Sequence, residues 1–108
     1  MNPTSKIIFS THRYRYLKEK ILRLSDFEEG VMEIKKFPDG EIYQRILSSV
    51  EGREAVVIGG TISDEDTLEL FDLACSIEYY GAISLTLVIP FFGYSTIFKV
   101  WKPSNIFF

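Results

Sequence analysis

A strand, helix, strand pattern in the second half of the chain most constrains the fold. Residues 55–58 and 85–89 are apolar runs of strand length, the pattern of strands that are covered on both faces of a parallel sheet. Between them, Ser63 is placed to cap a helix that we expect to run to about Tyr80, and Gly81 is placed to end it. Two strands joined in this way predict a right-handed crossover and a mainly parallel sheet.

Shorter patterns complete an expected α/β fold with helices flanking the sheet. Residues 7–9 form an apolar run that predicts a buried strand, and a helix is expected from about Tyr14. Apolar residues at helical spacing indicate the buried side of each helix. The first helix is expected to bury Leu17, Ile21 and Leu24, and the second is expected to bury Leu68, Phe71, Cys75 and Ile77.

The segment between residues 31–36 and 42–47 has strong turn chemistry. Both flanking segments are rich in strand formers, and proline followed by Asp-Gly favours a tight turn, so one β-hairpin is expected. The turn displays Phe37, Asp39 and Glu41. An aromatic ring with two carboxylates suits the face and the edge of a purine, but a polar turn with Phe37 tucked into the core fits the turn equally well.

Size, charge and cysteine content narrow the class of protein. A chain of 108 residues with 46% hydrophobic residues is expected to form one globular domain. Its net charge of −3 disfavours nonspecific binding to nucleic acid or to an anionic membrane. Neither a signal peptide nor a run of about twenty apolar residues is recognisable, and the single cysteine allows no intrachain disulfide. We therefore expect a cytoplasmic protein with no nucleic-acid or membrane partner.

Several weaker signals are assigned no catalytic or metal-binding role. The Gly-Gly-Thr sequence at residues 59–61 lacks the lysine of a phosphate loop and precedes acids, so it is interpreted as a plain turn. His12 has no metal-ligand companions and is interpreted as a solvent-facing loop residue. The basic residues among positions 12–20 are expected to form a solvated helix face, and Cys75 is expected to be a small core residue.

The turn also carries a family resemblance. Residues 36–41 resemble the Phe-x-Asp-Gly-Glu segment of ribose-phosphate pyrophosphokinases, and three further segments match the same family in order, at 50–53, 68–70 and 88–94. The resemblance implies a phosphoribosyltransferase-like amino-terminal domain at residues 1–94. Residues 95–108 are left as a divergent apolar tail in which we recognise no strand or helix. This tail either packs back on the domain, joins a partner, or marks a chain that is cut short or altered in sequence.

The family transfers diphosphate from Mg-ATP to ribose 5-phosphate within a cytoplasmic homo-oligomer. Its adenine contacts correspond here to Phe37, Asp39 and Glu41, and in the family this turn reaches a nucleotide bound largely by a neighbouring subunit. The resemblance thus implies ATP and ribose 5-phosphate as substrates and magnesium as cofactor. No magnesium ligand is identified in this chain.

The departures from the family pattern define the functional hypotheses. Tyr94 is followed by Ser-Thr-Ile at residues 95–97, where most members have Ala-Arg-Gln-Asp. A site is expected in the loop at residues 91–94, at the carboxyl end of the preceding strand. The family's metal-binding histidine, mobile basic loop and carboxyl-terminal domain have no counterparts. We therefore expect a truncated or fragmentary pyrophosphokinase that is inactive alone. The alternatives are a noncatalytic module that assembles with full-length relatives and, less favoured, a stand-alone nucleotide sensor.

Overall fold

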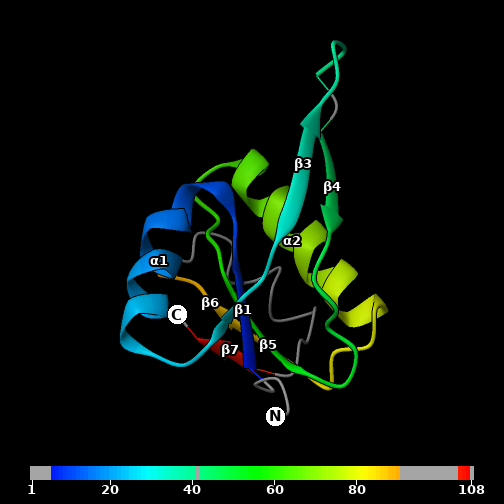
Figure 1. Cartoon of the computed structure of the whole chain (residues 1–108). Coiled ribbons are helices and arrows are strands. Elements are labelled where there is room, and N and C mark those ends of the chain that lie inside the picture. The colour runs from blue at the N-terminus through cyan, green and yellow to red at the C-terminus, as the bar shows by residue number, and fades with distance from the viewer. Residues whose placement is uncertain (1–5, 41, 91–104, 108) are drawn as a thin grey trace.

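The fold is built on a parallel sheet, as the apolar runs predict. The computed structural model describes residues 6–40, 42–90 and 105–107 (Figure 1). Its five-stranded sheet has the order β2-β1-β5-β6-β7, and every neighbouring pair is parallel. The strands are β1 (Lys6–Ser10), β2 (Glu28–Glu29), β5 (Glu54–Ile58), β6 (Ser84–Val88) and β7 (Asn105–Phe107).

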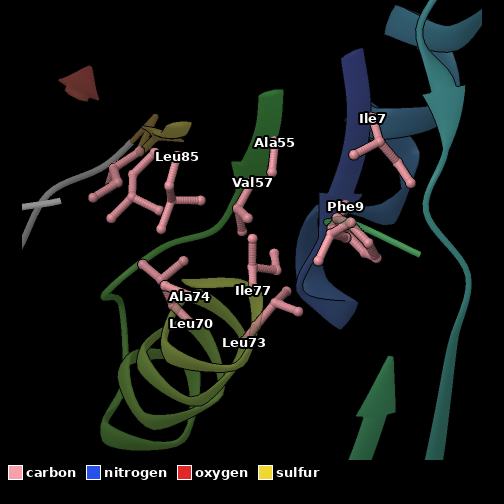
Figure 2. Close-up of a cluster of buried hydrophobic side chains, with 12 residues drawn as sticks. Ile7, Phe9, Ala55, Val57, Leu70, Leu73, Ala74, Ile77 and Leu85 are labelled. Carbon is pink, nitrogen blue, oxygen red and sulfur yellow. The ribbon is translucent and has the colours of Figure 1, made fainter. Parts of the chain in front are cut away.

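Two helices cover opposite faces of this sheet because side chains alternate along each strand. Ile7 and Phe9 of β1 belong to the core under α2 (Asp64–Tyr79). The intervening Ile8 packs instead with side chains of α1 (Arg15–Leu24), which follows the short helix η1 (His12–Tyr14). Figure 2 shows the α2 side of the core, where helix side chains meet those of the strands.

Helix α2 begins and ends as expected, but its buried face is not the predicted one. The Ser63 hydroxyl oxygen accepts a hydrogen bond from the Asp66 N–H at 3.1 Å, and Gly81 follows the helix with a φ of +94°, which favours glycine. The prediction is right for Ile77 and wrong for Leu68, Phe71 and Cys75, which are exposed. The side chains that face the sheet are Leu70, Leu73, Ala74 and Ile77 (Figure 2).

Helix α1 packs less deeply than expected. Leu17 and Ile21 contact the second core cluster, as predicted, and Leu22 joins them. Leu24 is 89% exposed, so its predicted burial is wrong. It is the last residue of the helix, where the side chain is free to turn towards solvent.

The predicted hairpin is present and stands apart from the main sheet. Strands β3 (Met32–Lys36) and β4 (Ile42–Ile46) pair antiparallel and form a separate two-stranded sheet. At its base, Met32 and Ile46 pack on the core. The other end projects beyond the body of the molecule, above α2 (Figure 1).

The carboxyl-terminal segment contributes a strand that the sequence did not predict. Strand β7 pairs with β6 and extends the sheet, so residues 105–107 pack back on the domain, which is one of the three alternatives left open for the tail. The loop at residues 91–94, where a site was expected, lies outside the described residues. Within the described part of the chain, no helix is long and apolar enough to cross a membrane.

Candidate functional site

The turn between β3 and β4 places two of the three predicted adenine contacts at the tip of the hairpin. The Gly40 N–H donates to the Phe37 carbonyl oxygen at 2.9 Å, and the φ of Gly40 is +92°, a value that favours glycine. Phe37 is 46% exposed and Asp39 is exposed, so the interpretation that tucks Phe37 into the core is wrong. Glu41 lies outside the described residues.

A cleft of about 660 Å³ runs from this turn along the side of α2. The hairpin contributes one wall, the first turns of α2 contribute the other, and the loop after β1 contributes the end. Ile34 and Leu68 supply apolar surface. The complete lining is His12, Arg13, Ile34, Gly40, Gln44, Glu65, Asp66, Leu68, Glu69 and Asp72.

Two contacts between distant parts of the sequence hold the end of the cleft together. Arg13 Nε donates to Asp66 Oδ2 at 2.7 Å, and the His12 backbone N–H donates to Glu69 Oε2 at 2.7 Å. Sequence analysis found no carboxylate near His12 and missed this site. A signal was available, since neighbouring parallel strands end at the same sheet edge, and His12 follows β1 while Asp66 follows β5.

The electrostatics of the cleft are unfavourable for a phosphate chain. Glu65, Asp66, Glu69 and Asp72 line it, against Arg13, whose partner is Asp66. Burial raises the pKa of the Glu69 carboxyl, although the hydrogen bond from His12 works in the opposite direction. An ATP triphosphate placed here would face several carboxylates, so the cleft suits neutral or cationic groups better.

The residues present do not fit a magnesium ion. Among the described residues, no three His, Cys, Asp or Glu side chains are arranged to hold a metal. The two best-buried cleft carboxylates are already engaged by Arg13 and by the His12 N–H. Magnesium needs several oxygen ligands in an octahedral arrangement. We therefore assign no magnesium ligand among the described residues.

The glycines after β5 serve packing. A Cβ on Gly60 would lie 2.6 Å from Tyr14 Cε2, and one on Gly59 would lie 2.5 Å from Leu70 Cδ1. Both distances are far below van der Waals contact. Close approach of the helices thus accounts for the Gly-Gly sequence, in keeping with its interpretation as a plain strand-to-helix turn.

Two other sequence candidates take clear positions. Cys75 is exposed, so its assignment to the core is wrong. Partial desolvation and the neighbouring Glu78 and Asp72 carboxylates raise the pKa of its thiol, which disfavours the nucleophilic thiolate. In the basic stretch, Lys18 pairs with Glu29 at 3.0 Å, so this face is more tied to the protein than the sequence suggested.

Comparison with known proteins gives a consistent result. The family model for the N-terminal domain of ribose phosphate pyrophosphokinase matches residues 6–105. A ribose-phosphate pyrophosphokinase of Pyrococcus abyssi is 39% identical over 93 residues, covering 84% of this chain and 31% of the relative. One from Methanosarcina acetivorans is 34% identical over 89 residues, covering 82% and 31%. The chain thus spans about a third of the length of these relatives.

Solved structures support the same fold. Phosphoribosylpyrophosphate synthetase from Mycobacterium smegmatis superposes with a TM-score of 0.75 at 20% identity, over 84% of this chain and 31% of that one. A purine phosphoribosyltransferase from Pyrococcus horikoshii gives a TM-score of 0.61 at 14% identity, over 98% and 70%. The expected phosphoribosyltransferase-like α/β fold, with a mainly parallel sheet and one hairpin, is confirmed.

Proposed function

Because the chain belongs to the family of the N-terminal domain of ribose-phosphate pyrophosphokinase, we propose that it supplies the adenine-binding turn of such an enzyme. The proposed contacts are Phe37, Asp39 and Glu41. We propose that this enzyme transfers diphosphate from Mg-ATP to ribose 5-phosphate. The name of the relatives, ribose-phosphate pyrophosphokinase, supports the transfer of this group to a ribose phosphate.

The single observation that carries the proposal is the exposure of Phe37 on a projecting turn. A half-exposed aromatic ring offers a face on which a base can stack, and the adjacent Asp39 carboxylate can accept a hydrogen bond from an exocyclic amine. An apolar ring at the tip of a two-stranded hairpin contributes little to the core, so a binding role explains its position better than a packing role.

The negative charge of the neighbouring cleft suggests in which direction the phosphates of a bound nucleotide would extend. With its base on Phe37, the phosphates would avoid the carboxylates of Glu65, Asp66 and Glu69 that line the cleft. We propose that they extend away from this chain, towards a neighbouring subunit. The assembly would be a homo-oligomer or a complex with a full-length relative.

Diphosphate transfer depends on cations placed around the moving group. The cleft offers mainly carboxylates, and the described residues do not fit magnesium. We therefore propose that the groups that bind phosphate and metal lie outside the described part of the chain, and expect the chain alone to be inactive.

A second candidate function, a noncatalytic module that assembles with full-length relatives, is favoured by one feature. Large apolar side chains are exposed on the hairpin and on α2, including Ile34 at 46% and Leu68 at 63%, and both line the cleft. Such a surface is suited to association with another protein. In this case the chain would join an oligomer without contributing to nucleotide binding.

The two candidates are separated by measuring adenine-nucleotide binding to the assembled protein. Its oligomeric state is first determined by sedimentation, and Mg-ATP is then titrated calorimetrically. Loss of one base-stacking contact in Phe37→Ala is expected to weaken binding by roughly tenfold. Tyr79→Ala is the matched control, since Tyr79 is an exposed aromatic residue on α2 outside the cleft lining.

Equal affinities for the wild type and Phe37→Ala would refute the adenine-turn proposal and favour the noncatalytic module. A coupled assay for phosphoribosyl pyrophosphate completes the test. Its formation by the purified chain alone from Mg-ATP and ribose 5-phosphate would overturn the expectation of inactivity.

A further inference from the structure

The two helices that cover the sheet carry opposite charge. Helix α2 has six carboxylates and no basic residue, whereas α1 has four basic residues and one carboxylate. The two helices pack on opposite sides of the sheet (Figure 1). The molecule therefore has an acidic side and a basic side, although its net charge is only −3.

The acidic side contains the cleft described above, and two of the cleft carboxylates have no cationic partner. Glu65 and Asp72 are exposed and form no ion pair within the described ranges of the chain. Leu68 follows at helical spacing between them and is 63% exposed. All three side chains line the cleft on the α2 side, opposite the hairpin. We call Glu65, Leu68 and Asp72 the acidic patch.

The basic side carries a matching set of residues with the opposite charge. Tyr16, Lys20 and Arg23 recur at helical spacing on the solvent side of α1, and all three are exposed. Lys18 is held by Glu29 at 3.0 Å. In contrast, neither Lys20 nor Arg23 forms an ion pair in the part of the chain that the structure describes. We call Tyr16, Lys20 and Arg23 the basic patch.

We propose that the cleft of one copy of this chain receives the basic patch of a second copy. Residues 16–23 and 65–72 each extend about 10 Å along their helices, so the two patches have the same length. The cations of the basic patch meet the unpaired carboxylates of the acidic patch, and the Tyr16 ring covers Leu68. An amphipathic helix that lies in a groove is a recurrent mode of protein recognition. This inference rests on the proposed oligomeric assembly and names the surfaces that form it.

Charge complementarity identifies a second copy as the occupant of the cleft. The cleft combines carboxylates with apolar surface, and a surface that combines cations with an aromatic ring is present on the same chain. Pairing of two acidic patches, or of two basic patches, would bring like charges together, which opposes association. Every copy can therefore offer its basic patch to one neighbour and its cleft to another.

The positions of the two patches determine the symmetry of the contact. Because they lie on opposite sides of the sheet, two copies cannot exchange both contacts around one twofold axis. The contact is therefore head-to-tail. Such contacts produce a ring when the rotation closes and a filament when it does not. We expect species larger than a dimer as the protein concentration rises, whereas a twofold contact through α2 alone would stop at the dimer.

The first measurement is sedimentation velocity of the purified full chain, without nucleotide, over a range of protein concentrations. The contact of a ten-residue helix buries a small area and is expected to be weak, so the series extends to about 1 mM protein. The runs are made at about 0.1 M and about 1 M NaCl, where the screening length is about 10 Å and about 3 Å. Association is expected at the lower salt concentration and is expected to weaken at the higher one.

Two charge-reversal variants test the patches themselves. One combines Lys20→Glu with Arg23→Glu, and the other combines Glu65→Lys with Asp72→Lys. Each variant alone should associate at least about tenfold more weakly than the wild type, because attraction between the patches becomes repulsion. An equimolar mixture of the two variants should recover association, since the reversed patch of each one is complementary to a patch of the other. A variant that had merely lost its fold would not be rescued in this way.

Lys35→Glu combined with Lys36→Glu is the matched control. It changes the net charge by the same amount as the basic-patch variant, but both lysines are exposed on β3, outside the two patches. This control should associate like the wild type. The proposal is overturned if the wild type stays monomeric at the lower salt concentration, if the mixture of reversed variants fails to associate, or if the control loses association as the basic-patch variant does.

The outcome is independent of the adenine-turn proposal, because Phe37 belongs to neither patch and no nucleotide is present. Phe37→Ala should therefore associate like the wild type even where it loses affinity for Mg-ATP. Conversely, a wild type that binds Mg-ATP through Phe37 but shows no head-to-tail association would overturn this inference alone.

Discussion

The ion pair between Arg13 and Asp66 joins the loop after β1 to the first turn of α2, and a double-mutant cycle should detect its coupling. The atoms Arg13 Nε and Asp66 Oδ2 are 2.7 Å apart, and the side chains are 49% and 10% exposed. Hydrogen bonds to charged groups contribute about 1.5–3 kcal/mol when well shielded, whereas fully exposed pairs contribute about 0.2–1 kcal/mol. With one partner half exposed, we expect a coupling free energy of about 1 kcal/mol.

The cycle uses Arg13→Gln, Asp66→Asn and the double variant, each unfolded with urea at low salt. Asp66→Asn should be the more destabilising single change, since it also removes a negative charge from the helix N-terminus, where such a charge contributes about 0.3–1 kcal/mol. The Arg45 to Glu33 pair on the hairpin is the control, with atoms 3.7 Å apart and both side chains more exposed.

The control pair is expected to show a coupling of less than about 0.5 kcal/mol. A coupling for Arg13 and Asp66 no larger than that of the control would refute the view that this contact holds the end of the cleft together. The coupling should decrease in high salt but not vanish, because one partner is buried.

Two further predictions follow from burial. The raised pKa of Glu69 means that the folded state binds the carboxyl proton more tightly than the unfolded chain does. The protonated carboxyl therefore stabilises the fold below the ordinary pKa of 4.5, and this stabilisation is lost as pH rises through the folded pKa. Glu69→Gln, which keeps an acceptor for the His12 N–H, should therefore match the wild type in acid and exceed its urea midpoint near neutral pH; equal pH profiles would contradict this. Ile77→Ala should lower the free energy of unfolding by about 3 kcal/mol because Ile77 is fully buried, whereas Leu68→Ala should change it by less than about 0.5 kcal/mol. A larger loss of unfolding free energy for Leu68→Ala in urea denaturation would instead support the buried face of α2 that the sequence predicted.

The elements that the sequence predicted well are those whose signals are local. The apolar run at residues 55–58 becomes the central strand β5, and Ser63 caps α2 through the Asp66 N–H. The Pro-Asp-Gly turn forms where expected, and the family resemblance that rested on it is confirmed.

The buried face of α2 shows where periodicity is insufficient. Leu68, Phe71 and Cys75 recur at helical spacing, but so do Leu70, Leu73 and Ile77. Both stripes are apolar, so the pattern alone does not identify the buried one. The sheet buries the second stripe. The first stripe stays exposed, and its Leu68 lines the cleft.

The cleft depends on contacts that no local pattern encodes. Asp66 and Glu69 meet Arg13 and His12 only because β1 and β5 are neighbours in the sheet. The three adenine contacts came from the turn and the resemblance, and their role stays a prediction.

The hairpin projects from the body of the molecule (Figure 1), so a small tilt at its base would move its tip. Its five-residue strands span about 17 Å, so a tilt of about 10° at the base displaces the tip by about 3 Å. This displacement is about the length of a hydrogen bond, so it could make or break a contact at the tip. It requires no change of conformation within the turn. A base held between Phe37 and a second protein surface would therefore restrain the tip of the hairpin. Nucleotide binding and subunit contact would each favour the other, because both need the same position of the tip.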